Sequence, residues 1–239
     1  MAWLKSTCLA GFVVLFACGQ AFANPCPPGN PPTNCAPPLG AILDLNGTAI
    51  SHVYTQYTTS FVATNATTNI SFAFREDPAF LFLDDVDVHD TTVVGPNLLL
   101  NPGFELGPVG ANAPTNWTYL NTFGASFAGV VQNQPGQAHS GSNYYFDGAV
   151  QAYDGITQGI ATTVGHTYSI SFWLNDNSGL NTFSRLSTNG DVSGTGGNGV
   201  DLLVYAGAIP SLATVPEPAT LTLVGLGGLA AAYRRRRRS

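Results

Sequence analysis

The stretch His166–Leu174, HTYSISFWL, decides the fold class of this chain. Its apolar residues recur at every second position and therefore share one face of an extended segment: Tyr168, Ile170, Phe172 and Leu174. The other face carries Ser169, Ser171 and Trp173. A second stretch, Asn69–Phe74 (NISFAF), repeats the pattern, with Ile70, Phe72 and Phe74 as its inward set. A period of two predicts β-strands with one buried face.

The sequence around these stretches, residues 40–206, extends the same pattern. It is rich in Thr, Ser, Gly, Asn, Phe and Val, and it is poor in the strong helix formers Lys and Glu. Short alternating runs are separated by turn residues about every ten positions, which is typical of a β-sandwich or jelly roll. We therefore expect an all-β domain here, followed by a linker at 207–215.

The first 23 residues have the features of a secretory signal peptide with a helical apolar centre. Lys5 supplies an early positive charge, the apolar run Leu9–Phe16 follows, and Ala21-Phe22-Ala23 precedes Asn24. This order predicts export and cleavage by signal peptidase before Asn24. A competing interpretation is a lipoprotein signal ending at Cys18, but Phe16 is bulkier than that motif usually tolerates.

The C-terminus combines a proline motif, an apolar segment and a basic end. Pro216, Glu217 and Pro218 precede the apolar residues 219–233, and five arginines follow at 234–238. A transmembrane helix of this length covers about 22 Å, less than the roughly 30 Å hydrocarbon core. The arginines should stay cytoplasmic, which places everything before Pro216 on the outer side of the inner membrane.

This order of features at 216–239 resembles the PEP-CTERM sorting tail. The resemblance implies that an exosortase processes the chain near Glu217 and that the mature protein joins the cell surface or the exopolysaccharide of a biofilm matrix. The alternative is an ordinary tail anchor with a basic flank. The two prolines favour sorting, because they end any helix outside the membrane and leave Glu217 extended and accessible.

The segment left after removal of both ends, residues 24–215, is acidic. It holds thirteen of the fourteen acidic residues but only Arg75 and Arg185 as basic ones. Such a charge repels phosphate backbones, so nucleic-acid binding is excluded from our expectations. Its two cysteines, Cys26 and Cys35, lie in a Pro-rich segment at 24–39, and an oxidising destination favours a disulfide between them.

Two pieces of the domain resemble the carbohydrate-binding-module-like jelly rolls that often precede PEP-CTERM tails. Asn97–Glu105 (NLLLNPGFE), together with Trp117 and Ser171–Asp176 (SFWLND), resembles the opening half, here residues 97–206. The closing half resembles residues 40–90, from Tyr54 to Val88, and in this chain it comes first. Either one sandwich is circularly permuted, or a truncated module precedes another. We favour permutation, because the pieces are complementary rather than repeated.

The run Phe82–Val88 (FLDDVDV) raises the question of a buried charge. Strict alternation places Asp84 in phase with Phe82, Val86 and Val88, on the core side. An unpaired buried carboxylate is too costly to persist, so Asp84 needs a cation, several donors or a bulge that turns it outward. In the modules that the chain resembles, a structural calcium lies near the first-strand glutamate, here Glu105, and the last-strand aspartate, here Asp84. The plainer interpretation is that such acids only solvate a sheet edge.

Candidate sugar-binding residues are aromatic or carry amides: Trp173, Tyr144, Tyr145 and Asn175. Pyranose rings stack on flat aromatic faces, whereas their hydroxyls need polar partners. Trp117 is more simply a core residue. The case for an enzyme is thin, because the four histidines have no partner spacing and no nucleophile motif is present.

We therefore predict an exported, exosortase-sorted, non-catalytic surface or matrix protein that binds exopolysaccharide through a calcium-stabilised jelly roll. A structural or adhesive protein that contacts other proteins is the main alternative. A glycoside hydrolase is the third.

Overall fold

The computed structural model describes residues 37–209, with gaps at 47, 49, 78, 151, 178–184, 187–191 and 194–198. These residues belong to one compact unit, Asn24–Thr214. The predicted signal peptide, the Cys26–Cys35 pair and the sorting tail at 216–239 lie outside the described residues. Within them, no helix is long and apolar enough to cross a membrane.

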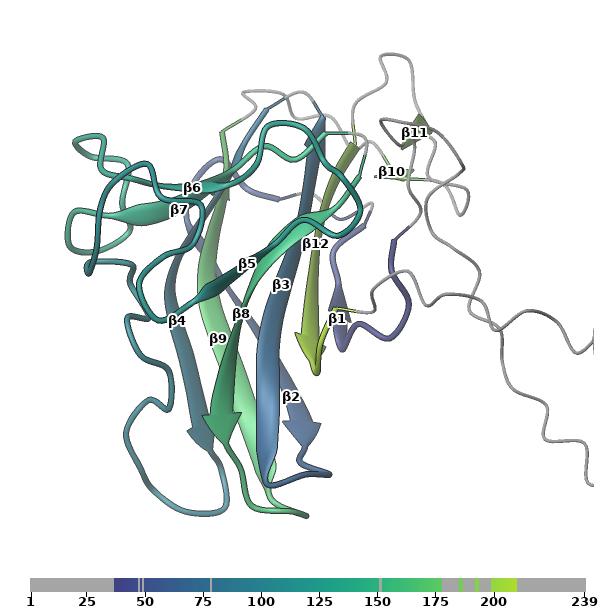
Figure 1. The fold of residues 1–239 in the computed structure, drawn as a ribbon, viewed down its shortest axis with the longest axis vertical. Coiled ribbons are helices and arrows are strands. Elements are labelled where there is room, and N and C mark those ends of the chain that lie inside the picture. Colours follow the sequence, from purple (N-terminus) through teal and green to yellow (C-terminus); the bar gives the residue numbers. More distant parts are fainter. Residues whose placement is uncertain are drawn as a thin grey trace, which may run out of the picture. The chain divides into compact units, whose positions relative to one another are not determined.

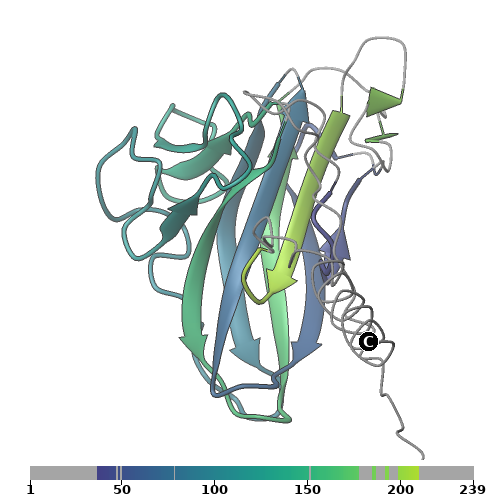
Figure 2. The same ribbon diagram turned by 45° about the vertical axis from the view of Figure 1, so that its right-hand side comes forward.

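Two five-stranded antiparallel sheets face one another (Figures 1 and 2). The first sheet has the order β1 (Leu43–Asp44), β12 (Gly199–Ala206), β3 (Thr67–Asp77), β8 (Asp154–Ala161) and β5 (Thr118–Leu120). The second has the order β2 (Thr55–Val62), β9 (Thr167–Asp176), β4 (Leu81–Asp90), β7 (Tyr144–Asp147) and β6 (Val130–Gln132). A short hairpin pairs β10 (Arg185–Leu186) with β11 (Val192–Ser193). The prediction of an all-β sandwich is confirmed.

The core lies between the sheets and is built by the alternation read from the sequence. In β9, Tyr168, Ile170, Phe172 and Leu174 are all buried, and the residues between them are half-buried. In β3, Ile70, Phe72 and Phe74 are fully buried in the same core. Trp117 joins this core, as predicted, and its ring lies 5.8 Å from that of Phe104.

The segments 40–90 and 97–206 contribute to both sheets. In the second sheet, β9 lies between β2 and β4, and in the first sheet β3 lies between β12 and β8. The two segments therefore share one core instead of forming two separate sandwiches.

A β-bulge in β4 changes the face that Asp84 occupies. The register with β9 shifts between Asp84 and Asp87, and Asp85 adopts a left-handed backbone with φ of 46°. Leu83 pairs with the core residue Leu174, whereas Asp84 pairs with Trp173 on the outer face. The extra residue returns Val86 and Val88 to the core. Strict alternation was therefore the wrong assumption here, and the bulge alternative holds.

Candidate functional site: the outer face around Trp173

Three rings gather on the outer face of the second sheet. Trp173 of β9 is half-buried and is flanked by Gln56 of β2 and Asp84 of β4. The His139 ring stacks on the indole, with centroids 3.9 Å apart and planes 16° apart. Tyr54 meets His139 edge-on at 5.3 Å. The chain thus builds an aromatic cluster from three segments that are far apart in sequence.

Two adjacent carboxylates hold the loop that carries His139. Asp85 Oδ2 lies 2.6 Å from His139 Nδ1, and Asp85 Oδ1 accepts the Ser140 hydroxyl at 2.7 Å. Asp84 Oδ2 accepts the backbone N–H groups of His139 at 2.9 Å and Ser140 at 3.2 Å. Because the bulge lets two neighbouring side chains reach the same loop, the imidazole is fixed against Trp173.

Asp84 is fully buried beneath this loop, outside the sandwich core. Besides the two loop amides, its Oδ1 accepts the N–H of Asp85 at 2.8 Å. Burial and then the neighbouring Asp85 charge raise the pKa of Asp84 to about 7, and the three amides act in the opposite direction. The donors that this carboxylate was expected to need are therefore supplied by the backbone.

Glu105 anchors the other end of the same loop. Its Oε1 accepts the backbone N–H groups of Ser142 at 2.8 Å and Asn143 at 2.9 Å. Gly141 between the two anchors has φ of 60°, and a Cβ at this position would collide with the Glu105 carboxylate. The structure thus brings Asp84 and Glu105, the two predicted calcium ligands, to one loop at 139–143.

Two features of this arrangement disfavour a calcium centre. Calcium takes six to eight oxygen ligands. Asp84 Oδ2 and Glu105 Oε1 each already accept two amides, whose positive ends point to the place where a cation would bind. In the described part of the chain, no group of three or more His, Cys, Asp or Glu residues is arranged to hold a metal. Calcium stays a prediction for experiment.

The predicted sugar-binding residues divide between the two faces of the second sheet. Asn175 lies on the outer face with Trp173, and its amide donates to the His52 carbonyl at 3.2 Å. Tyr144 is also on this face but is fully buried, with its ring 4.8 Å from that of Phe82. Tyr145 pairs with Leu83, lies in the core and donates to the Asn112 carbonyl at 3.2 Å. Tyr145 therefore cannot stack on a ligand from outside.

Sequence reasoning missed His139, Ser140 and Tyr54 as parts of this site. His139 was passed over with the other histidines, because no partner spacing in the sequence marks it as part of a site. Its partners, Asp85 and Trp173, are 54 and 34 positions away. Only the fold brings them together.

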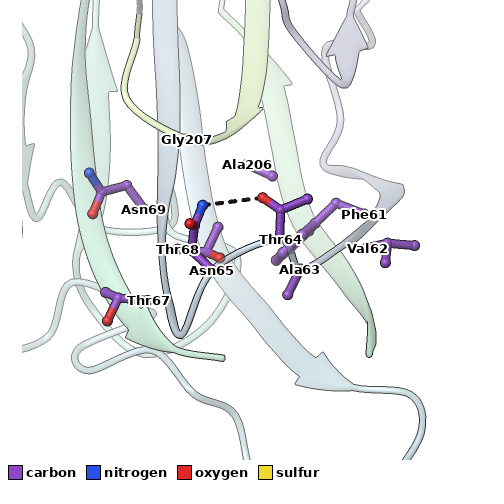
Figure 3. A pocket seen from close by; sticks show the side chains of 10 residues that line it. All are labelled: Phe61, Val62, Ala63, Thr64, Asn65, Thr67, Thr68, Asn69, Ala206 and Gly207. Atoms are coloured by element: carbon purple, nitrogen blue, oxygen red, sulfur yellow. Dashed lines mark hydrogen bonds between the residues drawn. The ribbon is translucent and has the colours of Figure 1, made fainter. Parts of the chain in front are cut away.

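A separate pocket lies at the turn between β2 and β3 (Figure 3). It has a volume of about 350 Å³ and is lined by residues 61–65, 67–69 and 206–207. Its polar groups are threonine hydroxyls and asparagine amides, and the Asn65 amide donates to the Thr64 hydroxyl at 3.2 Å. Its one aromatic residue, Phe61, is buried and stacks on Tyr168. Without a free aromatic face, it is the weaker candidate for a sugar site.

Comparison with known proteins identifies the C-terminal tail. Residues 214–238 match the PEP-CTERM protein-sorting motif, which confirms the prediction made from Pro216, Glu217 and Pro218. No curated protein and no solved structure matches the chain. The chain therefore carries the PEP-CTERM sorting motif of exported proteins, a membrane-anchored signal that implies processing by an exosortase.

Proposed function

We propose that this protein is a non-catalytic component of the cell surface or extracellular matrix, and that it binds exopolysaccharide through the outer face around Trp173. The observation that carries the proposal is the half-buried indole on an outer sheet face, with polar groups of Asp85, Ser140 and Asn175 beside it. This combination suits a pyranose ring, which stacks by its C–H face and presents hydroxyls at its edge.

The groups around Trp173 remain accessible to a ligand. The side chains of His139 and Asp85 are 28 % and 30 % exposed. His139 covers one face of the indole, so a sugar would extend the stack over the imidazole and contact the exposed edge of the indole. The fixed loop reduces the entropy that binding would cost.

The same face continues along the strands as rows of polar side chains. Thr58 of β2, Ser171 of β9 and Asp87 of β4 form one cross-strand row. Ser60, Ser169 and His89 form the next. A polar surface that spans three strands beside an aromatic cluster suits an extended polymer better than a small ligand.

A catalytic role is not part of the proposal. Ser140, His139 and Asp85 have the composition of a catalytic triad, but the hydroxyl of Ser140 donates to Asp85 and not to the imidazole. A nucleophile needs a base within hydrogen-bond reach. The arrangement instead supports a loop that is held in place for binding.

The proposal also includes several predictions made from the sequence. They are cleavage of residues 1–23 by signal peptidase, the Cys26–Cys35 disulfide, an inner-membrane helix at 219–233 and the origin of the domain as a permuted jelly roll. Each follows from the sequence patterns described above, and each is consistent with export.

Binding to exopolysaccharide extracted from the producing cells tests the proposal. Trp173→Ala should lose roughly tenfold in affinity, about 1.4 kcal/mol, while its melting temperature changes little. Phe127→Ala is the matched control, because Phe127 is 73 % exposed and lies outside the strands of the second sheet. Equal affinity of Trp173→Ala and the wild type would refute this binding face.

A protein-contacting role is the second candidate, and strand β2 favours it. β2 is an eight-residue edge strand without charge or proline, whereas the edge strands β1, β5 and β6 have two or three residues each. Long unprotected edges invite pairing with another strand. If Ser60→Lys abolishes surface association while added polysaccharide has no effect, this role is the correct one.

A further inference from the structure

Two aspartates from opposite sheets face one another inside the sandwich. Asp147 of β7 pairs with the core residue Leu81, and Asp154 of β8 pairs with the core residue Phe74. Opposite residues of an antiparallel pair share a face, so both carboxyl groups point inward. They are 0 % and 2 % exposed. The pair therefore links the two sheets across the core.

The hydrogen bonds around the pair leave two oxygens without a donor. Asp154 Oδ2 accepts the Tyr119 hydroxyl at 2.8 Å and the Gly129 N–H at 3.1 Å. Asp147 Oδ1 accepts the N–H of Ala149 at 2.9 Å. Within the described part of the chain, Asp147 Oδ2 and Asp154 Oδ1 have no donor. Gly129 brings the two carboxyl groups close together: its N–H donates to Asp154 Oδ2, and a Cβ added to it would collide with Asp147 Oδ2.

We propose that Asp147 and Asp154 share one proton at neutral pH, and that this proton joins the two sheets. Two ionised carboxylates in contact and away from water repel each other strongly, whereas an acid and a carboxylate attract. Asp147 carries the proton, because Asp154 has two donors to stabilise its charge and Asp147 has one. Neither the sorting motif nor the proposed sugar site assigns a role to this pair.

The described groups around the pair are mainly tyrosines and further acids. Tyr119 of β5 and Tyr145 of β7 face the pair. Glu76 of β3 and Asp176 of β9 are buried acids on the same inward face, because they pair with the core residues Val200 and Leu81. Arg75 pairs across the strands with Asp201 on the outer face of the first sheet, so it points away. Calcium would need six to eight oxygens, and the pair itself offers two that lack a donor. A proton satisfies both oxygens at once.

The shared proton makes the domain more stable in acid than in alkali. Burial, and then the charge of Asp154, raise the pKa of Asp147 well above its ordinary value. The unfolded chain releases this proton in mild acid, whereas the folded chain keeps it to a higher pH. Its contribution is therefore complete at low pH and is lost as the pH rises through the folded pKa. Alkaline conditions should loosen the contact between β7 and β8 first.

The test is thermal unfolding of the exported chain in detergent between pH 5 and 9. In Asp147→Asn the amide donates to Asp154 as the protonated acid does, but it cannot titrate. As the pH rises over this range, the melting temperature of the wild type should fall by roughly 5 °C or more because of this pair. The variant should lack that fall. Asp201→Asn is the matched control. It removes another buried acid, but it should keep the part of the melting-temperature loss that comes from Asp147 and Asp154.

A second readout follows the carboxyl groups directly. Infrared spectroscopy at neutral pH should show a stretching band of a protonated buried carboxyl group that the wild type and Asp201→Asn share and Asp147→Asn lacks. Absence of that band would overturn the proposal. So would an undiminished pH dependence in Asp147→Asn. An increase in melting temperature on adding calcium chloride, present in the wild type and absent in the variant, would show that a cation and not a proton joins the pair.

Discussion

Two of the buried carboxylates in the domain, Asp84 and Asp147, are satisfied in two different ways. Asp84, beneath the loop at 139–143, accepts three backbone amides. Asp147, between the sheets, accepts one amide and lies close to a second acid, Asp154, beside Gly129. The first carboxylate holds a loop in place, and the second holds two sheets together. A buried acid thus identifies a place where the fold depends on a specific partner, and that partner need not be a metal.

The largest expected effect comes from removing the carboxylate at Asp84. In Asp84→Ala three amides lose their acceptor, which should destabilise the domain by about 3 kcal/mol, or roughly 10 °C in melting temperature. Circular dichroism during heating measures this loss. The control is Asp87→Ala, a half-buried acid of the same strand, for which about 0.5 kcal/mol is expected. Equal effects of both changes would show that the amides do not depend on Asp84.

A smaller loss should follow from crowding the acid pair. In Gly129→Ala the new Cβ would collide with Asp147 Oδ2 and with the Tyr145 hydroxyl. Overpacking of this kind should cost about 2 kcal/mol, measured by urea unfolding. Gly95→Ala is the matched control, because no atom lies within 4 Å of its added Cβ. If Gly129→Ala leaves the free energy of unfolding unchanged, the packing around Asp147 and Tyr145 is looser than described.

The smallest effect is expected at the exposed end of the loop. Glu105→Gln keeps an oxygen that can accept the amides of Ser142 and Asn143 but loses the charge. The change should cost about 1 kcal/mol or less, since the side chain is exposed. Urea unfolding with and without calcium checks it. A large loss seen only with calcium present would indicate a metal ligand.

Local patterns predicted much of this fold. Alternation in His166–Leu174 and Asn69–Phe74 placed the core residues of β9 and β3, because a period of two follows from strand geometry itself. The sorting motif was readable because its residues are contiguous. The burial of Asp84 was also foreseen as a problem that needed donors, a cation or a bulge.

The remaining features depend on long-range pairing, which alternation does not report. The bulge at Asp85 moved Asp84 to the outer face, and a strand pattern alone cannot locate one extra residue. The same limit explains Tyr145, which has the right chemistry for sugar but the wrong face. The Asp147–Asp154 pair went unnoticed because its members belong to different sheets.

The central question is whether protein groups alone satisfy these acids. Thermal unfolding of the exported chain answers it, measured at one fixed pH first with excess chelator and then with excess calcium. We predict that the melting temperatures with chelator and with calcium agree within about 1 °C, because amides and a shared proton already occupy the carboxylates. A tightly bound ion at a hundredfold excess over its dissociation constant would add about 2.7 kcal/mol, or roughly 8 °C. A fall of that size on chelation, restored by calcium, would contradict the account and return Asp84 and Glu105 to the role of calcium ligands.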